Sequence, residues 1–157
     1  MLIEGDPAPG DRRFLILAAR FNRWITDRLV TGASGELLRR GTRAERIDTA
    51  WVPGSFELPA AARAAAGTGR YAAVICVGAI LKGETSHARL IADTCARGIQ
   101  DASAATGVPV TLGVIAADTF EQAEARCHTD GGRNLGADAA AAAADMAGLL
   151  ARLREGP

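Results

Sequence analysis

Residues 78–87, which read GAILKGETSH, combine the features of an anion site with a side chain that can move protons. They follow an apolar segment, Tyr71 to Val77, pass through a turn bounded by Gly78 and Gly83, and lead into a helix-like stretch. This order brings backbone N–H groups and the positive end of a helix dipole to the edge of a sheet, where phosphate binds without a metal. Histidine changes its charge near neutral pH, and His87, one of two histidines in the chain, stands in the first turn of that helix. The segment therefore predicts chemistry on a small phosphorylated molecule.

Two nucleotide-binding motifs resemble parts of the chain and fail on single features. Gly78 and Gly83 have the spacing of a P-loop and Thr85 fits its hydroxyl position, but Glu84 stands where the phosphate-binding lysine is required. A carboxylate there repels the terminal phosphates of a nucleotide, which argues against an NTPase. The glycines of residues 67–69 precede a strand instead of following one, so they do not form a dinucleotide fingerprint.

Apolar runs and helical patterns alternate along most of the chain. Such alternation predicts an α/β fold in three α/β/α layers, with a four-stranded parallel sheet between the helices. A length of 157 residues suits one domain over 1–157, with residues 1–12 as a loose N-terminal arm. Ligands of such sheets bind beyond the carboxyl ends of the strands. The expected strands are 14–19, 47–52, 71–77 and 108–116, and the expected helices are 25–40, 56–66, 86–106, 119–127 and 137–154.

The composition argues against several classes of protein. The formal net charge is zero, which gives no electrostatic reason to expect a nucleic acid or an acidic membrane as partner. No apolar run approaches the roughly 20 residues that span a bilayer, and the N-terminus lacks the basic and apolar regions of a signal peptide. The cysteines, Cys76, Cys95 and Cys127, are odd in number and lack the pair spacing of a metal site. We therefore expect reduced thiols in a cytoplasmic protein without a bound metal.

Four residues have both a functional and a structural interpretation. Phe21 follows the first strand and either stacks on a planar heterocycle or folds into the core. Glu57 begins a helix and either accepts hydrogen bonds from ligand hydroxyls or complements the helix dipole. Arg126, late on a short helix, either forms a fork for phosphate or is solvated. His87 is either a general acid–base or a surface cap, and spacing alone leaves all of these alternatives open.

Five segments together resemble one family. They read ARFNRWITDRLVTGA, WVPGSFELPAAA, GAILKGETSHARLIAD, TGVPVTLGVIAADTFEQAEAR and LGADAAAAAADMA, and they run in order from about Phe14 to Leu149. The chain resembles the lumazine synthases, the penultimate enzymes of riboflavin synthesis, and the second, third and fourth segments are specific to that family. The resemblance implies a flavodoxin-like sheet and active sites shared between neighbouring subunits of a homopentamer. It favours the functional interpretation of all four residues above.

The resemblance also implies a role for each site residue. Phe21 would stack on the pyrimidine of 5-amino-6-(D-ribitylamino)uracil, and His87 would shuttle protons. Arg126, contributed by the adjacent subunit, would clamp the phosphate of 3,4-dihydroxy-2-butanone 4-phosphate. The ring and ribityl chain would be held by Ser55, Phe56, Glu57, Ala79, Ile80 and Leu81, with Leu112 in the wall against the pyrimidine, and the phosphate would be cradled by Gly83, Glu84 and Thr85.

The reaction that the resemblance implies needs no cofactor, because the substrate's own 5-amino group condenses with the ketone. Phosphate then leaves by elimination, and the chain closes onto the ribityl-bearing nitrogen with loss of water. Proton transfers to oxygen and from carbon suit an imidazole, and holding both reactants together removes much of the entropic barrier. The phosphate site positions the ketone and stabilises the leaving group. An association with riboflavin synthase is a further partnership that the resemblance implies.

The sequence departs from the family's usual pattern at three places. Lys82 replaces an arginine, which keeps the charge but loses the fork, and Leu112 replaces a phenylalanine. Residues 127–136 replace the commoner compact turn with a longer one, in which Leu135 replaces a lysine. In this family longer turns go with free pentamers and compact turns with icosahedral shells built from pentamers. We therefore expect a free pentamer.

Two other functions stay open on the sequence. Lys82, the only lysine, is a candidate nucleophile for a Schiff-base lyase or aldolase. The second is a non-catalytic oligomer that binds flavin-like ligands through Phe21, although the presence of both His87 and Arg126 argues against it.

Overall fold

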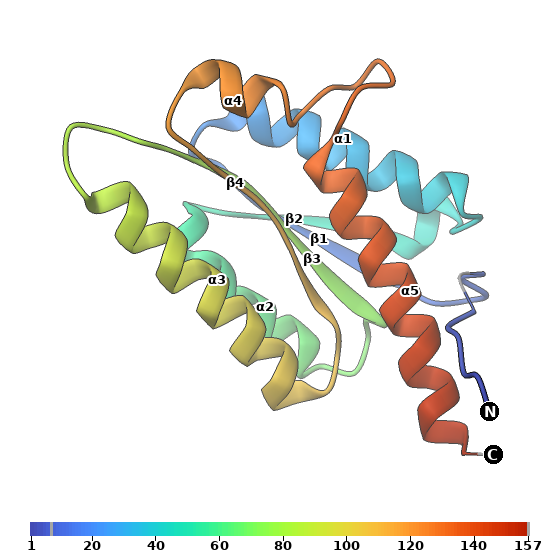
Figure 1. Ribbon diagram of the computed structural model, residues 1–157. Helices are drawn as coiled ribbons and strands as arrows, with labels where there is room; N and C mark the ends of the chain where they lie inside the picture. Colours follow the sequence, from blue (N-terminus) through green and yellow to red (C-terminus); the bar gives the residue numbers. More distant parts are fainter. Residues whose placement is uncertain (7, 157) are drawn as a thin grey trace.

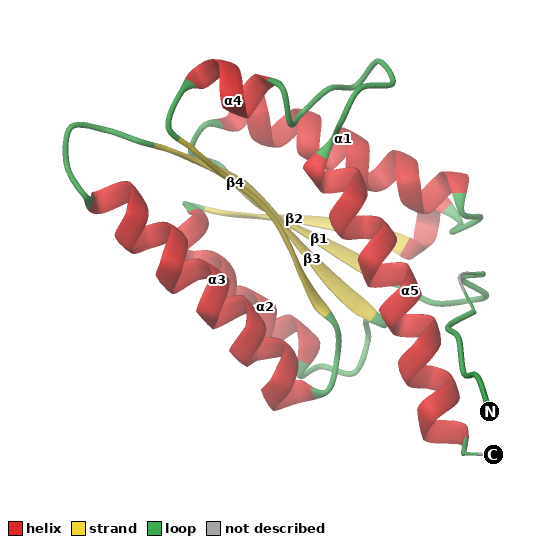
Figure 2. Cartoon of the chain, in the orientation of Figure 1, coloured by secondary structure: helices red, strands yellow, loops and turns green. Residues whose placement is uncertain are grey.

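The computed structural model describes residues 1–6 and 8–156. Within them, parallel strands form one four-stranded sheet in the order β2-β1-β3-β4. Figures 1 and 2 show α1 and α5 on one face of this sheet and α2 and α3 on the other, which confirms the predicted three-layer, flavodoxin-like α/β/α fold. The strands are β1 (Phe14–Ala19), β2 (Ile47–Val52), β3 (Ala73–Leu81) and β4 (Val110–Ala117), and the helical segments are α1 (Arg23–Arg39), η1 (Ala44–Arg46), η2 (Ser55–Glu57), α2 (Leu58–Ala66), α3 (His87–Thr106), α4 (Phe120–Glu124) and α5 (Leu135–Glu155).

Each face of the sheet has its own apolar core, because alternate side chains of a strand point to opposite faces. In β1, Phe14 and Ile16 belong to the core shared with α1 and α5, whereas Leu15 and Leu17 belong to the core shared with α2 and α3. All four side chains are buried. A strand covered on both faces is expected to be continuously apolar, which explains the uninterrupted run of β1.

The third strand is longer than the sequence predicts. Its expected end was Val77, with a turn at Gly78, but β3 runs to Leu81 and stays paired with β4 up to Leu81 and Ala117. Gly78 is needed for close packing and not for a turn, because a Cβ at this position would lie 2.7 Å from Ser55 Oγ and 3.1 Å from Ala19 Cβ. The prediction of a glycine-bounded turn starting at Gly78 is therefore wrong.

The ends of the last two helices also differ from the predictions. α4 ends at Glu124 and not near Cys127, since the chain there turns into an isolated antiparallel bridge between Cys127 and Asn134. α5 begins at Leu135 because Asn134 caps it, with its Oδ1 accepting from Ala137 N at 3.0 Å. The Asn134 amide also donates to the backbone oxygens of Arg28 (3.0 Å) and His128 (2.9 Å). This buried side chain thus fixes the turn before α5 against α1.

The N-terminal arm has no helix or strand within residues 1–6 and 8–12. It lies against α5, where Arg152 Nη1 donates to Glu4 O at 2.8 Å and a Cβ on Gly5 would meet the backbone of Asp145. Within the described residues, no helix is both long and apolar enough to cross a membrane. The same part of the chain contains no group of three or more His, Cys, Asp or Glu side chains that could hold a metal ion.

The cysteines are free and buried. Burial, and to a lesser degree the neighbouring Cys95, raises the pKa of the Cys76 thiol far above its usual range, and burial raises the pKa of Cys95 to about 11. Because the thiolate is the nucleophilic form, Cys76 and Cys95 act as small apolar core residues.

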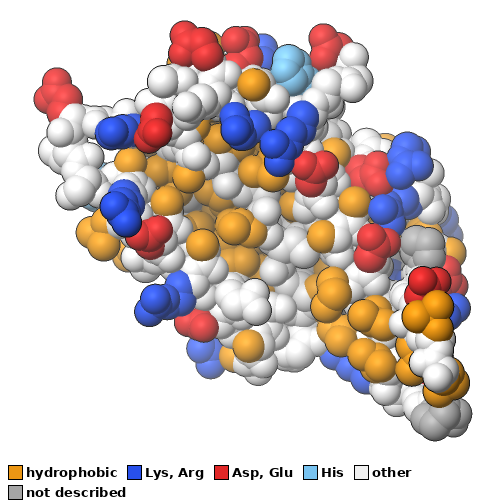
Figure 3. All heavy atoms as spheres, in the orientation of Figure 1, with side chains coloured by type: hydrophobic (Ala, Val, Ile, Leu, Met, Phe, Trp, Pro, Cys, Tyr) orange, Lys and Arg blue, Asp and Glu red, His pale blue; other side chains and the backbone are white. Residues whose placement is uncertain are grey.

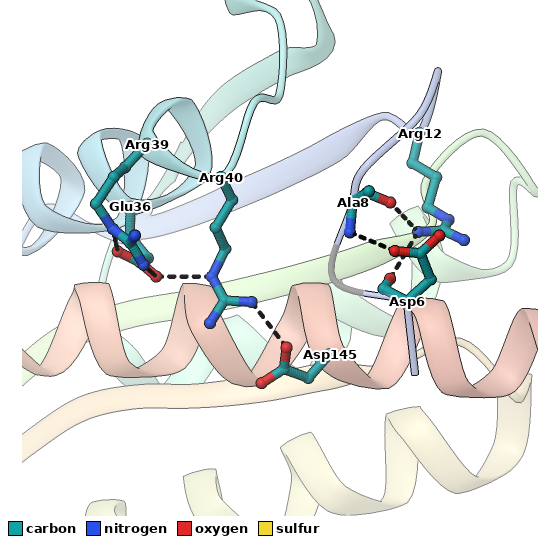
Figure 4. A network of polar contacts seen from close by, with 7 residues as sticks. All are labelled: Asp6, Ala8, Arg12, Glu36, Arg39, Arg40 and Asp145. Carbon is teal, nitrogen blue, oxygen red and sulfur yellow. Dashed lines mark hydrogen bonds and ion pairs between the residues drawn. The ribbon is translucent and has the colours of Figure 1, made fainter. Parts of the chain in front are cut away.

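An ion-pair network joins the C-terminal half of α1 to α5 (Figure 4). Glu36 accepts from Arg39 Nε at 2.8 Å and from Arg40 Nε at 2.7 Å, and Arg40 Nη1 donates onward to Asp145 Oδ1 at 2.7 Å. The hydrogen bond from Arg39, supported by Arg40, lowers the pKa of Glu36 to about 2 against the opposing effect of burial. The Glu36 carboxylate is thus held charged at the contact between the two helices.

We predict that Glu36→Gln lowers the free energy of unfolding at pH 7 by about 1–2 kcal/mol, after allowance for solvent screening. Because the folded-state pKa is depressed, this contribution is fully present above the ordinary value of 4.5 and disappears as the pH falls towards 2. Urea unfolding of both proteins between pH 7 and 2 measures the difference. Glu45→Gln is the control, since Glu45 forms a 3.3 Å pair with Arg43 but is 65% exposed. A gap between wild type and Glu36→Gln that does not shrink on acidification would contradict the assignment.

Candidate active site

A cavity of about 610 Å³ lies beyond the carboxyl ends of β1, β2 and β3, beside the start of α3. This is the place where open parallel sheets bind ligands. The lining residues come from three segments far apart in the sequence, 21–22, 53–57 and 79–91, as the alternation of strands and helices requires. They are Phe21, Asn22, Pro53, Gly54, Ser55, Phe56, Glu57, Ala79, Ile80, Leu81, Gly83, Thr85, His87, Ala88, Leu90 and Ile91.

Phe21 faces outward into this cavity. The backbone continues alongside β2 after β1 ends, since Arg20 N donates to Val52 O at 2.9 Å and Phe21 N donates to Pro53 O at 3.1 Å. The turn that begins here leaves Phe21 74% exposed. The alternative that Phe21 folds into the core is therefore wrong, and the ring is free to stack on a planar ligand.

The segment after β2 forms a tight turn that presents a carboxylate and a second aromatic ring. Glu57 Oε2 accepts from Gly54 N at 2.9 Å, which fixes the side chain against its own turn. Within the described residues no hydrogen bond occupies Glu57 Oε1. Ser55 is buried beneath the turn, while the Phe56 ring is 60% exposed. A polar ligand chain can therefore meet an acceptor beside an apolar wall.

The unequal lengths of β1 and β3 leave a strand edge open inside the cavity. The last β1–β3 pair is Ala18 with Val77, but β3 continues with β4 as far as Leu81. Backbone groups alternate between the two sides of a strand, and Lys82 N donates to Ala117 O at 2.9 Å on the β4 side. The N–H and C=O of Leu81 therefore point to the side that β1 has vacated. Ala79 and Ile80 also line the cavity but are buried.

The start of α3 lies at the cavity, where the sequence predicts an anion site. Ser86 precedes the helix without a side-chain cap, and the first turn contains no acidic residue, so no carboxylate within the helix offsets the positive end of the dipole. Thr85 Oγ1 accepts from His87 N at 3.3 Å, which shapes the turn. The His87 side chain is exposed and reaches the same cavity. The helix N-terminus and the His87 imidazole therefore lie at the same end of the pocket.

The structure does not bring every predicted residue to this cavity. Glu84, Leu112 and Arg126 are absent from its lining, as is Lys82. Leu112 lies on the edge strand β4 and is 46% exposed. The Arg126 guanidinium lies beside α4, where its Nη1 donates to Gln122 O at 2.8 Å. Within the described part of one chain, no arginine or lysine lines the pocket.

Several lining residues were missed by the sequence analysis. Leu90 and Ile91 follow His87 by three and four positions on α3, so they share its helix face and extend the apolar wall. That spacing was available in the sequence. No sequence pattern indicates Asn22. Its side chain donates to Ala79 O at 2.9 Å, and that partner lies 57 positions further along the chain.

Comparison with known proteins identifies the family. A family model described as 6,7-dimethyl-8-ribityllumazine synthase matches residues 11–151. A protein of Gemmatimonas aurantiaca with the name 6,7-dimethyl-8-ribityllumazine synthase is 45% identical over 149 residues, which cover 95% of this chain and 90% of that protein. The chain belongs to the 6,7-dimethyl-8-ribityllumazine synthase family.

Membership in the lumazine synthase family agrees with the resemblance noted in the sequence. The matched residues include all of the cavity lining. Lys82, the candidate nucleophile of a Schiff-base enzyme, lies outside the lining. The geometry of the pocket thus favours the lumazine synthase chemistry over the alternative that depends on Lys82.

Close packing at Gly78 supports the floor of the pocket, and its loss has a predictable cost. We expect Gly78→Ala to lower the free energy of unfolding by about 1–3 kcal/mol, because the new methyl group would displace Ser55 or β1. Urea denaturation measures this change, and Gly35→Ala is the control because a Cβ there meets nothing within 4 Å. Equal stability of Gly78→Ala and wild type would show that the contact with Ser55 is not tight.

Proposed function

We propose that the protein catalyses the formation of 6,7-dimethyl-8-ribityllumazine from 5-amino-6-(D-ribitylamino)uracil and 3,4-dihydroxy-2-butanone 4-phosphate. It acts as a transferase in riboflavin synthesis. The observation that carries the proposal is a slot for a planar ring, between the exposed Phe21 and the open edge of β3, next to the start of α3. The family match and the name of the Gemmatimonas protein support the same reaction.

In this proposal the two ends of the cavity hold the two substrates. The pyrimidine stacks on Phe21 and meets backbone groups of residues 79–81, while its ribityl chain lies along Ser55, Phe56 and Glu57. The phosphate of the ketone lies at the start of α3, near Gly83 and Thr85. A helix N-terminus with no acidic residue in its first turn suits a dianion.

The chemistry then requires little beyond proximity and proton transfer. The 5-amino group of the pyrimidine attacks the ketone, and water leaves as the imine forms. Elimination of phosphate follows loss of a proton from carbon, and the ribityl-bearing nitrogen closes the ring with loss of a second water. His87 is the exposed acid–base group next to the phosphate end, so it is the group proposed to move these protons.

The pocket of one chain lacks a cationic side chain for the phosphate, and this supports a shared site. Arg126 is the proposed source, contributed by a neighbouring subunit. Figure 3 shows apolar side chains gathered over β4 on the visible face, between α3 and α4. This edge strand pairs with β3 on one side only and carries the exposed Leu112. We propose a homopentamer, free and not built into a shell, in the cytoplasm; association with riboflavin synthase belongs to the same proposal.

Two variants test both the reaction and the shared site. Wild-type protein should form the fluorescent lumazine from the two substrates, and we expect Phe21→Ala and Arg126→Ala to be strongly impaired. When the two variants are co-expressed and the mixed oligomer is purified through two tags, about a quarter of the sites should regain both intact residues. Activity of the mixture near that fraction supports a site between subunits. No recovery would place both residues in one chain's site, and no lumazine from wild type would favour a non-catalytic flavin-binding oligomer.

We further predict that Arg126→Ala damages turnover more than His87→Ala does. The condensation is chemically easy once the partners meet, so positioning outweighs proton shuttling. Losing a bidentate, partly desolvated phosphate contact should cost on the order of 2–4 kcal/mol. Loss of a general acid–base costs about 10²-fold, or about 2.7 kcal/mol, before water partly replaces it, and this replacement makes the His87 variant the less damaged one. Steady-state kcat/KM for both variants checks the ranking, which a slower His87 variant would reverse.

A further inference from the structure

Asn22 adopts a backbone conformation that is uncommon for its residue type. Its φ is 59° and its ψ is 43°, and no other non-glycine residue in the described part of the chain has a positive φ. Asparagine tolerates this left-handed region better than most residues. The turn lies between the exposed Phe21 and the first residue of α1, where the chain must leave the sheet.

The Asn22 side chain does not cap α1, although its position just before the helix suggests that role. An asparagine just before a helix usually accepts a hydrogen bond from the second or third helical N–H, but Asn22 makes no such cap. Its Nδ2 instead donates to Ala79 O at 2.9 Å. Because a carbonyl can only accept, the amide must present its NH₂ group there. Meanwhile Asn22 O accepts from Ile25 N at 3.0 Å, which anchors α1.

This hydrogen bond replaces the one that β1 would have supplied had it continued. Ala79 is the second residue of β3 beyond the last pair with β1, so its carbonyl is the nearest open acceptor on that edge. The Asn22 amide satisfies it, and Ala79 is only 2% exposed. The next backbone groups on the same side belong to Leu81, which is half-buried and lines the cavity.

We propose that Asn22 is a positioning residue for the pyrimidine ring. By occupying the Ala79 carbonyl it leaves the Leu81 N–H and C=O as the pair that meets the ring edge, and it fixes the distance between this edge and the Phe21 ring. The inference rests on the proposed function, since it concerns where the ring-bearing substrate binds in the slot. It assigns Asn22 no contact with the phosphate-bearing substrate.

Two substitutions separate the amide from the backbone conformation. Asn22→Gly keeps the freedom to adopt a positive φ but removes the amide. Asn22→Asp keeps the shape and tolerates the same conformation, but it replaces the donor by a carboxylate that repels the Ala79 carbonyl. The matched control is Asn134→Asp, the same change at the cap of α5, where the side chain also donates to backbone carbonyls but lies outside the cavity.

The readouts are the dissociation constant of 6,7-dimethyl-8-ribityllumazine, followed by its fluorescence, and the KM of each substrate. We expect both Asn22 variants to bind the lumazine about tenfold or more weakly and to raise the KM of the pyrimidine by a similar factor. The KM of the butanone phosphate should stay within about twofold. Asn134→Asp should lower Tm but leave lumazine binding within about twofold of wild type.

The outcomes distinguish this inference from the proposed function. If the wild-type protein forms the lumazine and either Asn22 variant binds the lumazine as tightly as wild type does, the positioning role is overturned. An equal rise in both KM values, or a lower Tm with unchanged binding, assigns Asn22 a structural role only and overturns it too. If wild-type protein neither binds the lumazine nor forms it, the proposed function itself fails, whatever the variants do.

Discussion

The central strands of the sheet end at different places, and the site depends on this difference. β1 stops at Ala19, while its neighbour β3 continues to Leu81 under the support of β4. Buried backbone donors and acceptors must be paired, so a strand edge without a partner strand needs another occupant. Asn22 takes one of these groups, and the others face the cavity. A planar heterocycle with amide-like edges can pair there much as a strand would, on a framework whose geometry the sheet already fixes.

The remaining parts of the site follow from where the adjacent segments leave the sheet. Phe21 is exposed because the chain turns after β1 while its next two N–H groups stay bonded to Val52 O and Pro53 O. Glu57 is presented by the turn that stops β2, and His87 by the first turn of α3. Together these segments give one chain an exposed aromatic ring, an open strand edge and a helix N-terminus around one cavity, but no cation in the described lining. The proposal of a site shared with a neighbouring subunit depends on this missing charge.

The sequence predicted most of the fold because its apolar runs are unambiguous. The limits of β1 and β2 were predicted to the residue, since both strands are bounded by polar or turn-forming residues. The end of β3 was missed because Gly78 has the signature of a turn, whereas its packing against Ser55 is visible only in three dimensions. Most of the cavity residues were also predicted, through the family resemblance. The role of Asn22 was not, because its partner is remote in sequence and no periodicity reports such a bond.

The open edge of β3 offers backbone groups to the cavity, so a change of side chain at a nearby position need not alter it. Lys82 replaces an arginine, yet its N–H bonds to Ala117 O and continues the β3–β4 ladder whatever its side chain is. The Lys82 side chain lies outside the cavity lining, so its exchange leaves the ring edge at Leu81 unaltered. Leu112, on the neighbouring strand β4, likewise lies outside the cavity lining of its own chain. Substitutions at these two positions therefore leave the cavity lining of their own chain unchanged, and that lining keeps the Leu81 edge, the Phe21 ring and the Asn22 side chain that donates to Ala79 O.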